Sequence, residues 1–245
     1  MSVSNEHQPE VAKHALQLAW TYGMTNVDHS VVHNLRDNYR VGVFYSSANT
    51  GIVYDYHNSK QHLLQGHCNK ITATAATDDK RYLITADTGE NSLLIVWDTM
   101  PRLELSVRKA NAQTIYSATM ANLTTFAPLP MKTLFDPHNG AGVLSVVFTP
   151  GVKQIITLGA DEPQTLSIWS WSDSINTAAE IKFPVATCTI SGSRQSYVQF
   201  NEAEPTEFMT TGPDAVYFFA FEEGKIHQFT PVTNFRFVLS AANAD

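Results

Sequence analysis

Residues 66–98, GHCNKITATAATDDKRYLITADTGENSLLIVWD, decide the fold of this chain. Short β-rich runs alternate here with turn residues, and we expect strands over 71–77, 82–87, 93–98 and 103–107, with a turn at 77–80. The two middle runs, Leu83-Ile84-Thr85-Ala86 and Leu93-Leu94-Ile95-Val96-Trp97, are apolar on both faces. Such strands must be covered from both sides. The stretch therefore predicts a four-stranded meander stacked between two neighbours.

The same meander recurs along the chain. It is expected over about 31–65, 143–190 and 197–229, with the turns between second and third strands near Asn49, Asp87, Asp161 and Asp214. The wide interval between the second and third of these turns predicts an inserted loop over 108–137, which is rich in proline and has no strand period. Without it, the interval approaches the 40 to 45 residues of a WD repeat. The sequence thus predicts an all-β fold, four blades of a WD-repeat β-propeller.

The domain boundaries follow from these repeats. The blades are expected over 16–240, between a flexible tail at 1–15 and a short tail at 241–245. Residues 16–20 alternate well enough to predict one more strand, and 235–239 are expected to begin or close a blade. Four blades are fewer than a usual seven-bladed ring needs, so we expect an N-terminal portion of a longer protein or a ring closed by another chain.

The spacing of Gly66-His67 and Trp97-Asp98 is typical of a WD repeat. It predicts a buried hydrogen-bond chain of His67, Thr85, Asp87 and Trp97, since buried polar groups need partners. We interpret this chain as structural rather than as a catalytic triad, because the Thr would lie inside a sheet with no nucleophile elbow nearby. The third blade keeps Trp169 but has Ser170 after it, so only the second blade is expected to carry the full signature.

The composition narrows the function further. The 245 residues carry a formal net charge of −7, which argues against a nucleic-acid-binding surface. No apolar run is long enough to cross a membrane, and the start of the chain has no signal-peptide pattern, so an intracellular protein is expected. The two cysteines, Cys68 and Cys188, are expected to be buried thiols. The sequence predicts no catalytic residue, cofactor or metal ligand.

Several segments carry a resemblance to a known family. The start of the chain, Leu18-Ala19-Trp20-Thr21-Tyr22-Gly23, resembles propellers of the echinoderm-microtubule-associated-protein group and its ciliary relatives. The further segments are 62–67, 86–89, 95–98, 168–171 and 215–223. Over about 16–230 the chain is similar to the cilia- and flagella-associated WD-repeat proteins of the calmodulin- and spoke-associated complex.

The resemblance implies a non-catalytic scaffold of the axoneme, in the cytoskeleton of a cilium or flagellum. It implies a place at the base of a radial spoke, the third in particular, where the protein helps attach the spoke to the doublet microtubule and regulate motility. Its implied partners are the radial-spoke-base proteins and the calmodulin- and spoke-associated complex, with the doublet contacted directly or indirectly. We expect the partner-facing surface to be the insertion at 108–137 together with the exposed turns.

Three alternatives stay open. The chain could be a cytoplasmic microtubule-associated propeller, distinguished by its absence from cilia, or a generic WD-repeat adaptor, since fold alone does not fix function. A propeller metal enzyme is the third, with Asp28, His29 and His33 as ligands. That spacing favours zinc only on a helix, whereas the segment is expected to lead into a strand.

Overall fold

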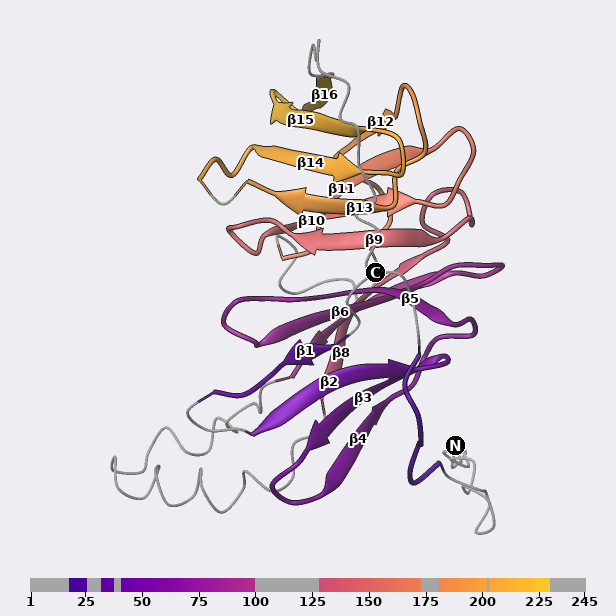
Figure 1. Ribbon diagram of the computed structural model, residues 1–245, viewed down its shortest axis with the longest axis vertical. Helices are drawn as coiled ribbons and strands as arrows, with labels where there is room; N and C mark the ends of the chain where they lie inside the picture. Colours follow the sequence, from indigo (N-terminus) through magenta and orange to yellow (C-terminus); the bar gives the residue numbers. More distant parts are fainter. Residues whose placement is uncertain are drawn as a thin grey trace, which may run out of the picture.

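Four antiparallel sheets of four strands each make up the fold (Figure 1). The computed structural model describes residues 18–25, 32–37, 41–99, 128–172, 181–201 and 203–229, and within these ranges it contains strands but no helix. Each sheet is a meander whose neighbouring strands are also neighbours in sequence. The predicted all-β fold with four blades is confirmed, and in the described ranges no helix capable of crossing a membrane is present.

The strand bounds agree closely with the expected meanders. The first two sheets consist of β1 (His33–Asn34), β2 (Gly42–Ser47), β3 (Thr50–Asp55) and β4 (Lys60–Leu64), followed by β5 (Ile71–Ala76), β6 (Tyr82–Asp87), β7 (Leu93–Asp98) and β8 (Leu129–Phe135). The last two consist of β9 (Val143–Phe148), β10 (Gln154–Gly159), β11 (Thr165–Ser170) and β12 (Ala186–Thr189), followed by β13 (Tyr197–Phe200), β14 (Glu207–Thr211), β15 (Val216–Glu222) and β16 (Lys225–Phe229). All four predicted turns lie between a second and a third strand.

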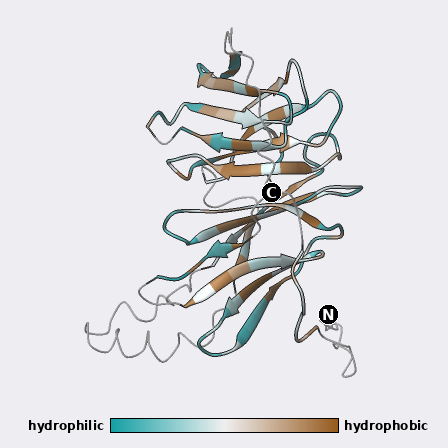
Figure 2. Ribbon diagram, viewed as in Figure 1, coloured by the Kyte–Doolittle hydropathy of each residue, from teal (hydrophilic) through white to brown (hydrophobic). Residues whose placement is uncertain are grey.

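The sheets stack in sequence order (Figure 1), and Figure 2 shows hydrophobic residues along the strands. Among the described residues, buried apolar side chains form three clusters between successive sheets. Side chains of a strand alternate between its faces, so each central strand supplies two layers. In β6, Leu83 packs toward the first sheet and Ile84 toward the third. In β10, Ile155 packs toward the second sheet and Ile156 toward the fourth. This two-sided burial is the reason the middle strands are apolar throughout.

The first strands of the second, third and fourth sheets lie side by side in sequence order. β5 contacts β9, and β9 contacts β13. Polar contacts join these strands: Thr72 Oγ1 donates to the carbonyl oxygen of Val143 at 2.8 Å, and the amide of Val198 donates to Ser145 Oγ at 3.2 Å. The strands therefore hold successive sheets in register by hydrogen bonds as well as by apolar packing.

The fourth strand of the second sheet corrects one prediction. β8, which pairs with β7 from Leu93↔Phe135 to Asp98↔Leu129, takes the place expected for residues 103–107. Residues 103–107 themselves lie outside the described residues. The predicted insertion at 108–137 extends too far at its C-terminal end, because residues 129–135 form β8. Residues 100–127, between β7 and β8, lie outside the described residues. The proline of β8 obscured its strand pattern, since Pro130 interrupts the alternation near a register shift between Val96 and Trp97 of β7.

Two smaller predictions also fail. Residues 18–20 form no strand; instead Trp20 packs edge-on against Tyr54 with ring centroids 6.1 Å apart, and the backbone amide of Thr25 donates to Ser46 O at 2.7 Å. Cys68 is exposed rather than buried and Cys188 is half-buried. Cys68 follows His67, and because His67 points into the sheet the next side chain points away. The expected tails at 1–15 and 241–245 and the segment at 235–239 lie outside the described residues.

Candidate functional site

The four residues of the expected hydrogen-bond chain meet inside the second sheet. His67, in the loop before β5, is held between Asp87 at the end of β6 and Thr85 within β6. Its Nδ1 lies 3.0 Å from Asp87 Oδ2, and its Nε2 lies 2.7 Å from Thr85 Oγ1. Trp97 Nε1 on β7 donates to the same Thr85 oxygen at 2.8 Å. One hydroxyl thus joins the third strand to the loop that leads into the sheet.

Asp87 extends this chain to the turn after β6. Its Oδ1 accepts the backbone amide of Leu93, the first residue of β7, at 2.6 Å. Its Oδ2 accepts from His67 and, at 3.4 Å, from the amide of Asn69. A carboxylate has only acceptors, so it satisfies several donors that the turn would otherwise leave buried without partners. The carboxylate therefore fixes where the third strand begins.

Burial excludes the triad interpretation of these residues. Thr85 is 0% exposed, and its oxygen is already engaged by both His67 and Trp97. A nucleophile must reach a substrate atom and face donors that stabilise the developing oxyanion. Thr85 does neither, because it lies on a central strand covered by neighbouring sheets. The arrangement can hold the blade together but cannot present a hydroxyl to a ligand.

The third sheet contains a second such chain, which the sequence interpretation missed. His138 Nε2 lies 2.8 Å from Thr157 Oγ1, and Trp169 Nε1 donates to that oxygen at 2.7 Å. The residue spacing could have identified it, because Trp169 follows Thr157 by 12 residues, as Trp97 follows Thr85. The His precedes the Thr by 19 residues in the third sheet and by 18 residues in the second. His138 was overlooked because it directly follows the segment taken as an insertion.

The third-sheet chain reaches its carboxylate through an extra hydroxyl. Thr165 Oγ1 lies 2.6 Å from His138 Nδ1 and donates to Asp161 Oδ2 at 2.6 Å. Asp161 Oδ1 also accepts the amide of Thr165, the first residue of β11, at 3.0 Å. Burial lowers the pKa of His138 to about 4, an effect that the nearby Asp161 carboxylate partly offsets. This imidazole is therefore neutral at pH 7.

The Asp of the Trp-Asp pair is not part of either chain. Asp98 is the buried last residue of β7, and Arg81 Nη2 donates to its Oδ2 at 3.2 Å. This contact, together with the Asp98 carboxylate, raises the pKa of Arg81. The replacement of that Asp by Ser170 in the third sheet consequently leaves the chain around Trp169 intact. Only the second blade carries the full sequence signature, but the third sheet keeps the hydrogen-bond chain without it.

The fourth sheet uses different residues at the corresponding place. Thr210 Oγ1 donates to Gln195 Oε1 at 2.8 Å, so an amide replaces the imidazole. Phe219 stands where Trp would supply an N–H, and it stacks on Phe208 with centroids 5.3 Å apart. Gln195 is tied to the third sheet, since its backbone N–H donates to Gln164 Oε1 at 2.7 Å. The fourth sheet therefore has a shorter chain that bridges two sheets.

Of the three residues weighed as metal ligands, the structure describes only His33; Asp28 and His29 lie outside the described residues. The His33 ring stacks on Phe44 with centroids 5.9 Å apart, and its Nε2 lies 2.8 Å from Thr74 Oγ1. Burial lowers the pKa of His33, and a hydrogen bond with the Thr74 backbone partly offsets this decrease. Within the described ranges no three His, Cys, Asp or Glu side chains gather as metal ligands would.

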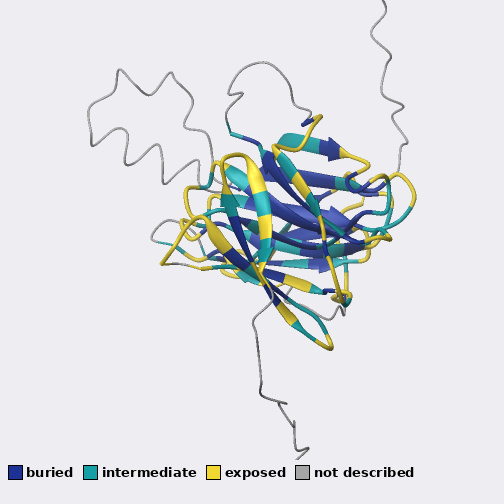
Figure 3. Cartoon of the chain, turned by 90° about the horizontal axis from the view of Figure 1, so that it is seen from above, coloured by how far each residue is buried: buried dark blue, intermediate teal, exposed yellow. Residues whose placement is uncertain are grey.

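Exposed side chains gather at the turns and on the outer strands (Figure 3). Because neighbouring strands run antiparallel, the turns from first to second and from third to fourth strands lie on one rim of the stack. The turns from second to third strands lie on the opposite rim. The stack therefore has two rims of turns, one at each end of the strands. Of the predicted contact surface at 108–137, only 128–137 are described, and most of these form β8.

Comparison with known proteins gives clear relatives. The chain is 34% identical over 234 residues to cilia- and flagella-associated protein 251 of Tetrahymena thermophila, which covers 90% of this chain and 20% of that protein. It is 30% identical over 223 residues to the protein of the same name from Chlamydomonas reinhardtii, covering 86% of this chain and 24% of the relative. The Mus musculus protein of that name is 27% identical over 85% of this chain. The matched segment makes up between 14% and 24% of the length of these relatives.

Solved structures support the fold alone. A chain in a crystal structure of the mitotic checkpoint complex aligns with a TM-score of 0.53 and 17% identity, over 80% of this chain and 50% of the other. No model of a known protein family matches the chain.

Proposed function

The chain is homologous to a segment of the proteins named cilia- and flagella-associated protein 251, and from that premise we propose that it is part of a non-catalytic scaffold of the ciliary or flagellar axoneme. The observation that carries this proposal is the 34% identity over 234 residues with the Tetrahymena protein. Relatives of the same name from an alga and from two mammals match over a similar share of the chain.

The geometry of the sheets suits such a scaffold. The residues that could be mistaken for catalytic groups, His67 and Thr85 in the second sheet and His138 and Thr157 in the third, are buried and bonded to one another. They stabilise the stack, and the surface left for partners consists of turns held by a rigid core. Binding residues are common on such turns, because loops tolerate variation while the scaffold positions them.

In its finer form, the proposal places the protein at the base of a radial spoke, the third in particular. There it helps attach the spoke to the doublet microtubule and so regulates motility. Its partners are radial-spoke-base proteins and members of the calmodulin- and spoke-associated complex. The chain covers about a fifth of its relatives, so contacts made by their remaining length are separate from those of these sheets.

Crosslinking in intact axonemes tests the proposal. The endogenous protein is tagged, axonemes are purified from ciliated cells, and lysine crosslinks are mapped by mass spectrometry. Lys60, Lys153 and Lys225 are exposed next to turns of one rim, and Lys70 is exposed on the opposite rim. Links from either group to spoke-base proteins are the expected result, and the lysine that reacts identifies the rim.

A conservative variant serves as the matched control. Lys70→Arg keeps the charge but removes the reactive amine. Only the crosslinks made by Lys70 should disappear, and those made by Lys60, Lys153 and Lys225 on the other rim should remain. A protein that is absent from axonemes contradicts the whole proposal and favours a cytoplasmic or generic adaptor. A protein present in axonemes but linked only to components remote from the spokes contradicts the finer form alone.

A further inference from the structure

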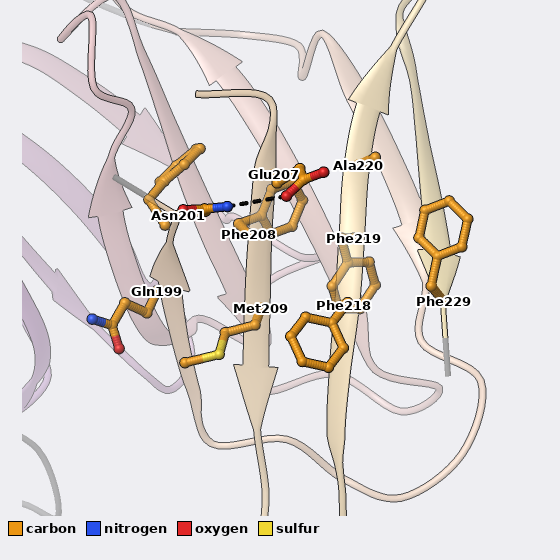
Figure 4. A pocket seen from close by; sticks show the side chains of 10 residues that line it. Gln199, Asn201, Glu207, Phe208, Met209, Phe218, Phe219, Ala220 and Phe229 are labelled. Atoms are coloured by element: carbon orange, nitrogen blue, oxygen red, sulfur yellow. Dashed lines mark hydrogen bonds between the residues drawn. The ribbon is translucent and has the colours of Figure 1, made fainter. Parts of the chain in front are cut away.

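The outward face of the fourth sheet forms a groove of about 690 Å³ with aromatic side chains on its floor (Figure 4). Phe218 on β15 and Phe229 on β16 are register partners, and they are 45% and 55% exposed. Met209 on β14 lies in the strand on the other side of β15. Large aromatic side chains gathered on an exposed face leave water only when another element covers them. The groove therefore has the apolar centre of a binding surface.

The groove ends at the rim that holds the turns from first to second and from third to fourth strands, and this end is acidic. Glu207 begins β14 and Glu222 ends β15, each an even number of residues from the apolar side chains of the floor and hence on the same face. Glu204 and Glu223 are exposed in the adjoining turns. Lys225 is the register partner of Glu222, so in the described part of the chain one lysine lies among four carboxylates.

The third sheet is neutral at a matching position of the face that the fourth sheet covers. Thr157 on β10 and Thr210 on β14 are equivalent, and three residues before them the third sheet has Gln154 where the fourth has Glu207. Glu207 Oε2 accepts from the neutral side chain of Asn201 at 3.0 Å, which does not compensate its charge (Figure 4). A carboxylate that loses its hydration when a face is covered needs a cation beside it. The acidic end therefore indicates an occupant that carries positive charge.

The backbone of the sheet indicates the conformation of this occupant. The central strands β14 and β15 are paired on both sides, so their N–H and C=O groups are used within the sheet and the face offers only side chains. A segment that crosses such a face must satisfy its own backbone hydrogen bonds, which an α-helix does alone. β15 has 7 residues, or roughly 23 Å at about 3.3 Å each. A helix of about 15 residues has the same length.

We propose that this face binds an amphipathic helix of a partner protein that carries Lys or Arg residues near one end. The apolar side of the helix packs on Met209, Phe218 and Phe229, and its basic residues lie beside Glu207 and Glu222. Such a helix has apolar residues at positions i, i+3, i+4 and i+7. The inference follows from the composition of one face and is independent of the ciliary proposal.

Fluorescence anisotropy with synthetic peptides tests the proposal. Two labelled peptides contain the same numbers of Leu and Lys residues: one repeats LKKLLKL, in which the leucines follow a helical period, and the other repeats LKLKLKL, in which they alternate as in a strand. The 245-residue chain should bind the helical peptide about tenfold more tightly than the alternating one. Circular dichroism should show that the bound peptide gains helix. A helical peptide with Glu in place of every Lys should not bind.

Substitutions of the aromatic floor assign the binding to this face. Phe218→Ser combined with Phe229→Ser should weaken binding of the helical peptide about tenfold. Phe183→Ser, at a residue that is 81% exposed before β12, is the matched control and should leave the affinity unchanged. Urea unfolding checks that each variant remains folded. If the double variant unfolds, Phe229→Ser alone, on the edge strand β16, repeats the measurement.

Substitutions of the acidic end test the charge of the occupant. Glu207→Gln combined with Glu222→Gln should weaken binding of the helical peptide about threefold and reduce its dependence on salt. Glu90→Gln, at an exposed residue of the opposite rim, should change neither.

Three results overturn the proposal. Equal affinity for the helical and alternating peptides excludes a helix as the occupant, and unchanged affinity in the folded Phe218 and Phe229 variants places the binding elsewhere. A dimer of the chain without peptide, detected by sedimentation velocity and dissociated by Phe218→Ser, assigns the face to a second copy.

Discussion

Replacing Thr85 by Val removes the hydroxyl on which the chain of the second sheet converges. Val keeps the shape and β-propensity of Thr, so the change is mainly the loss of one oxygen. That oxygen accepts from Trp97 Nε1 at 2.8 Å and lies 2.7 Å from His67 Nε2. Thr85 is fully buried, so no water replaces it. Two buried polar nitrogens are therefore left without a partner.

The expected cost follows from these two orphaned groups. Each buried polar group without a hydrogen bond costs about 1–3 kcal/mol, which gives roughly 2–6 kcal/mol for two. The methyl group that replaces the hydroxyl offsets about 1 kcal/mol through apolar burial. We expect a net loss of about 3 kcal/mol in the free energy of unfolding. For a chain of this size each kcal/mol lowers the melting temperature by about 2–4 °C, so the shift is roughly 6–12 °C.

Thermal and urea unfolding followed by circular dichroism measure the loss. Thr157→Val in the third sheet should behave like Thr85→Val, because its hydroxyl also serves a Trp and a His. Thr210→Val should cost less, since that hydroxyl donates only to Gln195 in the described contacts. Thr189→Val, at an exposed position of β12, should change stability by less than about 0.5 kcal/mol. If Thr85→Val lowers the free energy of unfolding no more than Thr189→Val does, the hydrogen-bond chain does not stabilise the blade.

Three further predictions concern single residues. Burial lowers the pKa of His138 to about 4 in the folded protein, so unfolding takes up a proton between pH 6.5 and 4. The contribution of His138 to the free energy of unfolding is therefore complete above pH 6.5 and falls by up to about 3 kcal/mol as the pH drops to 4. Urea titrations at several pH values should show this slope, and His138→Gln should flatten it; an unchanged slope assigns it to other groups. Gly142→Ala places a Cβ 2.5 Å from the backbone of the turn after β6 at a φ of +87°, and should destabilise the protein by more than Gly224→Ala, which at φ +76° meets nothing within 4 Å. Equal melting temperatures for the two variants contradict this. Cys68 should react with a thiol reagent at pH 7 much faster than Cys188, whose pKa burial raises to about 11, and comparable rates in the folded protein contradict their assigned environments.

The second and third sheets show why a short motif is an incomplete guide to the network behind it. In both sheets the hydrogen-bond chain consists of a hydroxyl on the second strand, an indole N–H on the third and an imidazole before the first. Both sheets supply these groups, at Thr85 with Trp97 and at Thr157 with Trp169. Asp98 makes a separate contact with Arg81 at the end of β7. A different residue after the Trp, such as Ser170 in the third sheet, therefore does not predict the loss of the hydrogen-bond chain.

The local sequence determined the strands and the stacking of this protein. Short apolar runs between turn residues predicted the limits of β6, of β7 and of the whole fourth meander. The stacking followed because a strand that is apolar on both faces must be covered on both faces. The partners of His67 followed as well, because a buried imidazole and carboxylate in one blade must satisfy each other. These properties depend on residues close together in one meander, which the sequence displays directly.

Only the tertiary structure decided which distant segments complete each sheet. β8 pairs with β7 across residues 100–127, and no local pattern specifies a partner over that distance, particularly where proline interrupts the strand. The same limit hid His138, whose role depends on Thr157 and Thr165 meeting it in space. The exposed face of the fourth sheet is likewise a property of the stack: Phe218 belongs to the same pattern as Ile168, and only the presence or absence of a neighbouring sheet makes one exposed and the other buried.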